Sequence, residues 1–352
     1  MRRVAGLAGG RVRVGGTRLP AYPPARLLLA ATFLALAPSL ARAQTSHLVV
    51  IQGIPGGEEY ATRFKGWAEE MIDGAQKAGV PQANIAYLAD AVPTGFPFTV
   101  GVSNKEQVEK TLTDLAAKAA PDDVVLILLI GHGSATGGES RFSIPGPDIT
   151  AKDFAKLLDK FPSQRVALVN AASASGEFVG PLSKKNRTIV TATRNGGEKN
   201  ETLFAGYFAK AYAEDGADTD KDGGVSLLEA FDFARREVAR FYEGERRLAT
   251  EHALIDDNGD KTGSREPNLT TGDGANARRF MLASRADGRA AGPADSALAP
   301  LYAEARKLEE AVATLRSKKD TMAAEAYETQ LEDLLVKLAE KNAEIRSKEK
   351  KP

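Results

Sequence analysis

Two unbroken runs of apolar residues stand out in the first half of the chain. Residues 123–130 read Asp-Val-Val-Leu-Ile-Leu-Leu-Ile, and residues 165–169 read Arg-Val-Ala-Leu-Val. Apolar runs of this length, bounded by charged residues, are typical of strands that are buried on both faces. Such strands occur in parallel sheets that are covered by helices. Each run is followed at once by a turn that contains glycine.

The rest of the pattern alternates between short strands and amphipathic helices, which predicts an α/β fold with a mostly parallel sheet and right-handed crossovers. We expect further strands at 47–51, 85–88 and 187–193, and helices at 58–78, 104–119, 150–161, 201–213 and 226–242. We interpret residues 91–102 as an irregular loop, 140–144 as a small ribbon, 254–263 as a polar turn and 278–282 as a final strand.

The pattern changes after residue 284. Residues 285–297 are rich in Ala, Gly, Asp and Pro, which is the composition of a linker. In residues 298–348 apolar positions recur at heptad spacing, in two sets separated by residues 317–321. This spacing predicts an antiparallel helical hairpin or short coiled coil. It is either an appendage packed on the main domain or an arm for oligomerisation or partner docking.

The N-terminal 43 residues differ from the rest in charge. They contain seven arginines and no acid; six of the arginines precede an apolar stretch at 27–40, and the seventh lies in the sequence Ala41-Arg42-Ala43 that follows it. This arrangement predicts a secretory signal peptide that is cleaved before Gln44, because some fourteen apolar residues are too few to cross a bilayer. The expected location is therefore periplasmic or secreted, with no membrane span after cleavage.

Removal of that segment reduces the 47 basic residues to 40, against 47 acids, which leaves a formal charge of −7. This balance, without a basic stripe, makes nucleic acid an unlikely partner. The chain also contains no cysteine. Disulfides, thiolate metal sites and a cysteine nucleophile are therefore excluded.

The turns after the two long strands carry the candidate chemistry. The first is Gly131-His132-Gly133, and the second is Ala172-Ser173-Ala174-Ser175-Gly176. Ligands bind at the carboxyl ends of strands in such sheets. His132 is a candidate base and Ser173 a candidate nucleophile, with the N–H groups of Gly133 and Ser173 as candidate oxyanion donors.

This order of motifs resembles the caspase-like fold, and most closely its legumain-type branch. The resemblance covers residues 47–265, and implies a three-layer sandwich within a domain of residues 44–284. In that branch the second strand ends Ala-Cys-x-Ser-Gly, so Ser173 occupies the place of the catalytic cysteine and His132 matches the catalytic histidine. Residues 191–202 are similar to the segment that forms the primary specificity pocket. The resemblance thus implies Arg194, Glu198, Asn200 and Glu201 as substrate-binding residues.

The serine in place of cysteine leaves three interpretations. The first is a pseudopeptidase that binds a peptide or protein partner without cutting it. The second is an active serine hydrolase with a Ser173–His132 dyad, which needs a third group to orient the imidazole; the candidates are Asp90, Glu139 and Asp148. The third is a purely structural or partner-docking protein. If the chain is active, Arg194 favours an acidic substrate side chain.

A separate motif lies at residues 218–229. Asp218, Asp220, Asp222, Gly224, Ser226 and Glu229 occupy positions 1, 3, 5, 7, 9 and 12 of an EF-hand loop, with Gly223 at position 6. This spacing predicts a structural Ca²⁺ site. The alternative is an acidic turn that caps the following helix. Asp256, Asn258 and Asp260 alternate similarly, but the required spacing is missing, and we interpret that segment as a turn with a second ion as the alternative.

Overall fold

The computed structural model describes residues 45–92, 95–162, 165–214, 216–267, 272–282 and 322–349, together with Gly10 and several single residues between 301 and 315. A sheet of seven strands forms its centre, in the order β10-β9-β8-β4-β1-β2-β3. All neighbouring strands are parallel except β10, which pairs antiparallel with β9. The expected α/β class with a mostly parallel sheet is therefore confirmed.

The large sheet consists of β1 (Ser46–Gln52), β2 (Ile85–Ala89), β3 (Thr99–Val102), β4 (Val124–Ile130), β8 (Arg165–Asn170), β9 (Arg187–Thr191) and β10 (Leu254–Asp256). A small antiparallel sheet consists of β5 (Gly133–Thr136), β6 (Glu139–Phe142) and β7 (Ile149–Thr150). The helices are α1 (Glu58–Lys77), α2 (Lys105–Lys118), α3 (Ala151–Leu158), α4 (Val179–Leu182), α5 (Phe204–Ala213), α6 (Leu227–Gly244), α7 (Ala275–Arg278) and α9 (Ala324–Glu349).

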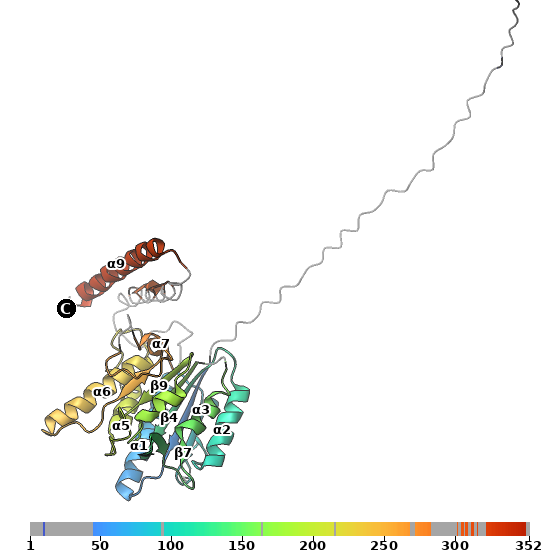
Figure 1. Ribbon diagram of the computed structural model, residues 1–352, viewed down its shortest axis with the longest axis vertical. Coiled ribbons are helices and arrows are strands. Elements are labelled where there is room, and N and C mark those ends of the chain that lie inside the picture. The colour runs from blue at the N-terminus through green and yellow to red at the C-terminus, as the bar shows by residue number, and fades with distance from the viewer. Residues whose placement is uncertain are drawn as a thin grey trace, which may run out of the picture. The chain divides into compact units, whose positions relative to one another are not determined.

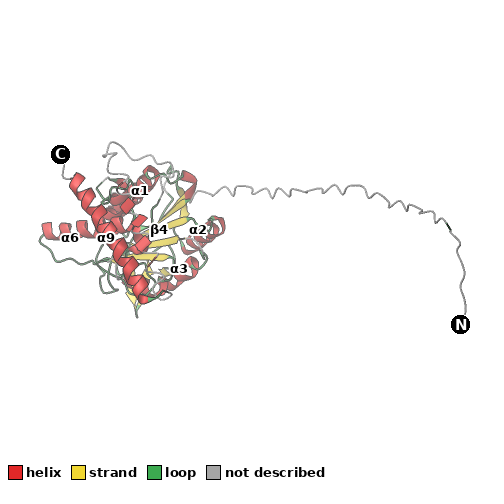
Figure 2. Ribbon diagram, turned by 90° about the horizontal axis from the view of Figure 1, so that it is seen from above, coloured by secondary structure: helices red, strands yellow, loops and turns green. Residues whose placement is uncertain are grey.

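Helices cover both faces of the large sheet. Figure 1 shows α1, α5 and α6 on one side of the strands and α2 and α3 on the other, and Figure 2 shows the same layers from above. Alternate residues of β4 enter the two resulting cores: Leu126 and Leu128 face the first, and Ile127 and Leu129 face the second. Since both faces of β4 are buried, its run of seven apolar residues is explained.

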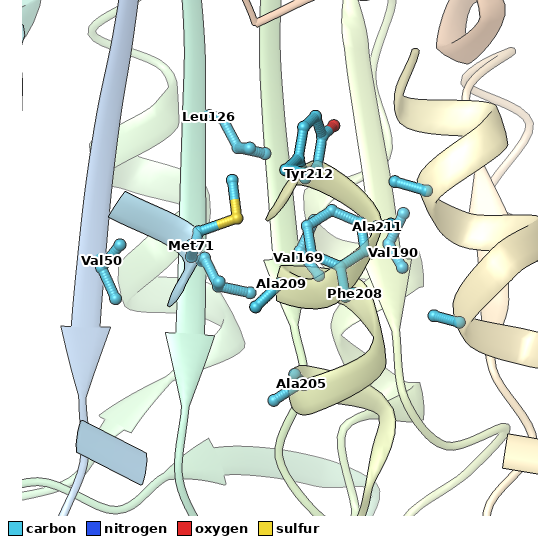
Figure 3. Close-up of a cluster of buried hydrophobic side chains, with 14 of the residues drawn as sticks. Val50, Met71, Leu126, Val169, Val190, Ala205, Phe208, Ala209, Ala211 and Tyr212 are labelled. Carbon is cyan, nitrogen blue, oxygen red and sulfur yellow. The ribbon is translucent and has the colours of Figure 1, made fainter. Parts of the chain in front are cut away.

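The first core contains more of the buried aromatic side chains than the second. Phe208 and Tyr212 of α5 and Met71 of α1 pack on residues such as Leu126 and Val169 of the sheet (Figure 3). Each of these five side chains is at most 8% exposed. Burial of a side chain of this size contributes about 1.5–3 kcal/mol, so these helices are held against the sheet mainly by apolar contact.

Three short elements differ from the sequence-based expectation. Residues 91–102 end in the edge strand β3, and residues 254–263 begin with β10, whereas the sequence pattern predicts a loop and a turn there. Residues 278–282 do not form a strand. Arg278 is instead the last residue of helix α7, whose start is capped by the carboxylate of Asp257 through hydrogen bonds from the N–H groups of Asn276 (2.8 Å) and Ala277 (2.7 Å). Of residues 279–282, only Met281 forms a β-bridge, to Ser226.

The C-terminal helix α9 is present as expected. Ile345 of α9 is buried in a cluster with Leu301 and Ala305, and Lys341 forms an ion pair with Glu304 at 2.7 Å. These contacts are the kind that a helical hairpin makes. Residues 317–321 and the predicted linker lie outside the described residues, as does the predicted signal peptide apart from Gly10. Within the described part of the chain, no helix is both long and apolar enough to span a bilayer.

The first strand is fixed at its start by a buried carboxylate. Asp123, just before β4, accepts hydrogen bonds from the N–H groups of Thr45 (3.1 Å) and Ala120 (2.8 Å) and pairs with His47 Nε2 at 3.0 Å. Burial alone would raise the pKa of Asp123, but the hydrogen bonds from His47, Ala120 and Thr45 outweigh it, so its pKa lies below the usual 3.8.

Replacement of Asp123 by asparagine should reduce the free energy of unfolding by about 1–3 kcal/mol at pH 7, because the partners of the carboxylate lose a charged acceptor. The folded-state pKa is lowered, so this contribution is complete above pH 3.8 and disappears as the pH falls through the folded-state value. Urea unfolding from pH 7 to pH 2 should therefore show wild type and Asp123→Asn converging in acid. The exposed neighbour Asp122→Asn is the control; a constant difference at all pH values would contradict the prediction.

Candidate functional site

The structure brings the two candidate turns together. Strands β4 and β8 are adjacent and parallel, from Val124 opposite Arg165 to Leu129 opposite Asn170. His132 follows the end of β4 by two residues and Ser173 follows the end of β8 by three. Both therefore lie at the carboxyl edge of the sheet, where ligands bind in α/β folds.

Ser173 is bonded to the other turn rather than to the imidazole. Its hydroxyl accepts a hydrogen bond from the N–H of Gly133 (3.1 Å) and donates one to the carbonyl of Gly133 (3.2 Å). The residue is 4% exposed. Both the proton and a lone pair of the hydroxyl are thus used within the protein, and the N–H of Gly133, a candidate oxyanion donor, is occupied by Ser173 itself.

The glycines of the two motifs are required by close backbone contacts. A Cβ on Gly133 would lie 2.4 Å from the carbonyl oxygen of Ser173, and a Cβ on Gly176 would lie 2.3 Å from the backbone nitrogen of Asn195. No real Cβ tolerates such distances. Between these glycines, Ala174 adopts a left-handed conformation with φ 52°. A non-glycine residue in that region is uncommon and is typical of a strained functional turn.

His132 is held by a backbone carbonyl and two aromatic rings. Its Nε2–H donates to the carbonyl of Pro55 at 3.1 Å, since a carbonyl can only accept. The rings of Tyr60 and Phe64, both on α1, meet the imidazole edge to face at centroid distances of 4.9 and 5.3 Å. The group that orients the imidazole is therefore Pro55.

The carboxylates considered for this role do not contact the imidazole. Asp90 accepts a hydrogen bond from Gln52 at 2.6 Å, and Glu139 pairs with Arg141 and Lys152. In the part of the chain that is described, no carboxylate, Asp148 included, forms an ion pair or hydrogen bond with His132. A serine hydrolase triad of the expected kind is thus missing from these residues.

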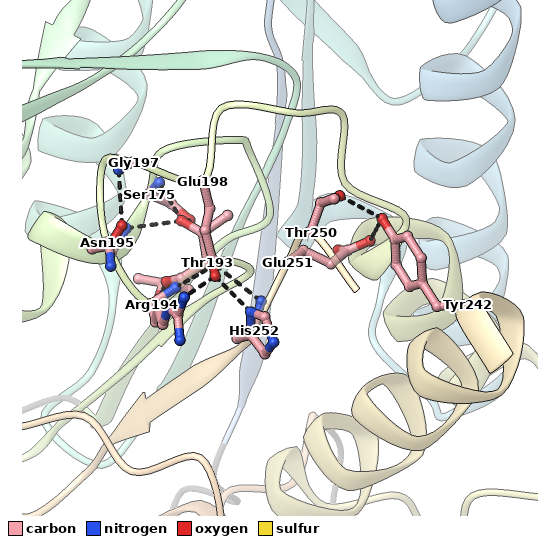
Figure 4. Close-up of polar contacts among 12 residues, drawn as sticks. Ser175, Thr193, Arg194, Asn195, Gly197, Glu198, Tyr242, Thr250, Glu251 and His252 are labelled. Atoms are coloured by element: carbon pink, nitrogen blue, oxygen red, sulfur yellow. Dashed lines mark hydrogen bonds and ion pairs between the residues drawn. The ribbon is translucent and has the colours of Figure 1, made fainter. Parts of the chain in front are cut away.

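In residues 191–202, the segment predicted to form the specificity pocket, the polar side chain of Glu198 is occupied by contacts within the protein. The carboxylate of Glu198 accepts from the N–H of Arg194 (3.0 Å), pairs with its guanidinium Nε (3.0 Å) and contacts His252 Nδ1 at 2.5 Å (Figure 4). Arg194 is therefore already neutralised by Glu198. The carbonyl of Glu198 in turn accepts the N–H of Ala174 at 2.8 Å, which ties this segment to the turn of Ser173.

The same segment is hydrogen-bonded to Ser175 and Gly176, the last two residues of the second motif. The hydroxyl of Thr193 accepts hydrogen bonds from the N–H groups of Ser175 (2.7 Å) and Gly176 (3.2 Å). Of the other predicted substrate-binding residues, Asn200 is exposed, and Glu201 lies beside Tyr60, whose ring packs on His132. Glu201 accepts from the hydroxyl of Tyr60 at 3.1 Å and pairs with Arg63.

Sequence reasoning missed four residues of this site: Pro55, Tyr60, Arg63 and His252. The guanidinium of Arg63 lies over the ring of Tyr60, 5.1 Å from its centroid. The hydrogen bond to Glu201, and then its negative charge, raise the pKa of Tyr60. The only available signal was the apolar face of α1, which includes Tyr60 but does not reveal that it faces His132. A surface depression of about 630 Å³ lies elsewhere, between the start of α2 and residues 145–147.

The acidic loop places three of its six predicted ligands together. Oxygens of Asp218, Asp220 and Asp222 lie within 4.8 Å of one another. Burial, followed by the charge of Asp222, raises the pKa of Asp220 to about 6, although Arg278 lies 3.3 Å from it. Ca²⁺ prefers hard oxygen ligands, and a bound ion would offset the repulsion between these carboxylates. The three residues therefore fit the ion.

Two of the remaining ligands, Ser226 and Glu229, are engaged in capping. Glu229 and Ser226 form a capping box at the start of α6, in which Ser226 Oγ accepts the N–H of Glu229 at 3.2 Å. Glu229 Oε2 accepts the N–H of Ser226 at 2.9 Å, and Glu229 Oε1 accepts hydrogen bonds from the N–H groups of Thr219 (2.8 Å) and Asp220 (3.2 Å). Gly224 donates its N–H to Asp222 at 3.0 Å. Glu229 thus closes the loop and caps the helix in this structure.

Comparisons with known proteins place these features in a broad context. No protein-family model matches the chain, and no curated protein matches it. Among solved structures, it is similar to the Drosophila initiator caspase Dronc (14% identity, 61% of this chain and 80% of that one, TM-score 0.37). It is also similar to protein GSU0716 from Geobacter sulfurreducens (12%, 68% and 100%, TM-score 0.40) and to Chaetomium thermophilum Raptor (11%, 59% and 20%, TM-score 0.31).

The close contact at Gly176 gives a direct test of the site. Gly176→Ala should reduce the free energy of unfolding by about 1–3 kcal/mol or more, because the added methyl group forces the turns of Ser173 and Arg194 apart. Gly66→Ala is the matched control: Gly66 is in α1, exposed and without neighbours within 4 Å, so alanine should stabilise by about 0.5–1 kcal/mol. Denaturant unfolding measures both, and equal effects of the two variants would refute the contact.

Proposed function

We propose that this chain is an exported, legumain-type caspase-like protein whose cleft binds a peptide or protein partner without cutting it. The observation that carries the proposal is the hydroxyl of Ser173, which is buried and exchanges hydrogen bonds with both the backbone N–H and the backbone carbonyl of Gly133. The order of the two motifs along the chain supports the family, and the basic and apolar leader with its Ala-x-Ala site supports export.

The contacts of Ser173 oppose nucleophilic attack. An attacking serine must lose its proton to a base, but here that proton points to the carbonyl of Gly133. An oxyanion hole needs a free N–H, but that of Gly133 is already bonded to the serine oxygen. Catalysis would therefore require Ser173 to break two hydrogen bonds before it could engage His132.

The surroundings of His132 suit recognition. The half-buried ring of Tyr60 supplies aromatic surface, with the buried ring of Phe64 behind it, and the ion pair of Arg63 and Glu201 lies beside it. Aromatic side chains flanked by charged groups are typical of surfaces that bind peptides. A peptide that crosses the carboxyl edge of the sheet would meet these groups.

A fluorophosphonate probe distinguishes this proposal from an active serine hydrolase. Wild type and Ser173→Ala should both remain unlabelled, and neither should release fluorophore from a mixed library of quenched peptides. Labelling of the wild type that is lost in Ser173→Ala would show a reactive serine and overturn the non-catalytic assignment.

Binding is tested separately with an array of fluorescent peptides on the immobilised protein. Tyr60→Ala should weaken retention of any bound peptide about tenfold, whereas Lys156→Ala, an exposed substitution on α3, should leave it unchanged. Binding that is insensitive to Tyr60→Ala would place the peptide elsewhere on the protein.

Because the chain has no cysteine, Ser173→Cys provides a second, independent test. The burial of this position predicts that its thiol reacts with iodoacetamide at least tenfold more slowly than the thiol of Ser134→Cys, which is exposed on β5. Mass spectrometry measures both rates. Faster alkylation at position 173 than at 134 would indicate an accessible, activated position.

We further propose that the loop of Asp218, Asp220 and Asp222 binds a structural Ca²⁺ ion. Support comes from the convergence of the three carboxylates and from the raised pKa of Asp220. Calcium should raise the melting temperature of chelator-treated protein by several degrees, and Asp220→Ala should abolish the rise. Since Asp220→Ala also removes repulsion, its melting temperature in chelator should not fall below that of wild type. Identical wild-type melting curves with Ca²⁺ and with chelator would remove calcium from this loop.

A further inference from the structure

A second group of acidic residues lies where β10 ends. Asp256 is the last residue of β10, Asp257 follows it, and Asp273 lies two residues before α7. They are 1%, 1% and 3% exposed. Asp256 and Asp257 are adjacent in the chain, and the N–H of Asp257 donates to Asp273 Oδ1 at 3.0 Å. Carboxylates are rarely this buried unless they are paired.

Two oxygen atoms in this group have no hydrogen-bond partner. Asp256 Oδ1 accepts the N–H of Gly259 at 3.0 Å, but its Oδ2 is buried and unpaired. Asp257 Oδ2 accepts the two N–H groups at the start of α7, but its Oδ1 is likewise buried and unpaired. An unpaired buried oxygen of a charged group costs several kcal/mol, so these two atoms need a partner that the chain does not supply.

The charge of the group is also uncompensated. In the described part of the chain, no lysine or arginine forms an ion pair with any of the three aspartates. Buried carboxylates that lack a cationic partner repel one another. A proton shared with Asp273 would relieve part of this repulsion. It would still leave the free oxygens of Asp256 and Asp257 without a partner.

We propose that Asp256, Asp257 and Asp273 bind a hard divalent cation, at a site separate from the loop of residues 218–229. Carboxylate oxygens are the preferred ligands of such ions, and an ion bound at the unpaired oxygens would supply a missing partner while offsetting the negative charge. Only Asp218, Asp220 and Asp222 bring three ligand atoms within 4.8 Å among the described residues. The ion at the second site is therefore held by fewer direct carboxylate bonds, with water completing its shell.

The site would have a clear structural task. The hairpin that joins β10 to Ser264 starts at Asp256, since Ile255 and Ser264 exchange backbone hydrogen bonds of 2.9 and 2.8 Å. Asp257 caps α7, and Phe280 beyond α7 is buried in the first core. A cation here would fasten the edge strand of the sheet to the segment that closes its core.

Calorimetric titration of the chelator-treated full chain with CaCl₂, repeated with MgCl₂, tests the proposal. Wild type should bind two Ca²⁺ ions, Asp256→Asn one and Asp220→Ala one, and the double variant none. Asn at 256 keeps the Oδ1 that accepts from Gly259, and Asp273→Asn keeps the Oδ1 that accepts from Asp257, so both should fold; circular dichroism checks this. The exposed Asp122→Asn is the control and should bind two ions.

The outcomes separate this site from the calcium loop. If the loop binds nothing, wild type should bind one ion that is lost in Asp256→Asn and kept in Asp220→Ala, which would support the second site alone. Ion binding that is unchanged in both Asp256→Asn and Asp273→Asn would overturn it. A higher melting temperature of Asp273→Asn in chelator, together with that unchanged binding, would identify a shared proton in place of the ion.

Discussion

The structure of the candidate site depends on one contact between two turns. The hydroxyl of Ser173 holds both the N–H and the carbonyl of Gly133, so the chain that leaves β8 is tied to the chain that leaves β4. This is feasible only because residue 133 has no side chain: its Cα faces the carbonyl of Ser173 at a distance that excludes a Cβ. The position of His132, one residue earlier, follows from the same contact.

The fold could be predicted from the sequence where burial dictates the pattern. Strand β4 is apolar at every position because both faces are covered, and α3 and α6 begin at Thr150 and Ser226, whose side chains form capping boxes. The strands β3 and β10 have four and three residues and lie at the sheet edges. Such short edge segments are defined by pairing with a neighbour, which local sequence does not encode.

The site was predictable in its position but not in its partners. The Gly-His-Gly and Ser-x-Ser-Gly turns identify the edge of the sheet, because each follows a recognisable strand. The carbonyl of Pro55 and the rings of α1 reach His132 only through tertiary packing. A backbone carbonyl has no sequence signature, which is why a search for a carboxylate partner found none that contacts the ring. The pairing of Arg194 with Glu198 likewise turns a potential substrate contact into an internal one.

The serine at position 173 is well explained by this environment. A thiol is a weak donor and a weak acceptor, whereas a hydroxyl forms both kinds of hydrogen bond well. The hydroxyl of Ser173 pairs with both the backbone N–H and the backbone carbonyl of Gly133, which a thiol at this position would do only weakly. Each of the two hydrogen bonds would contribute about 0.5–1.5 kcal/mol, and a serine so bonded must give up both before it can react. The same contact that ties the two turns together therefore opposes nucleophilic attack by Ser173.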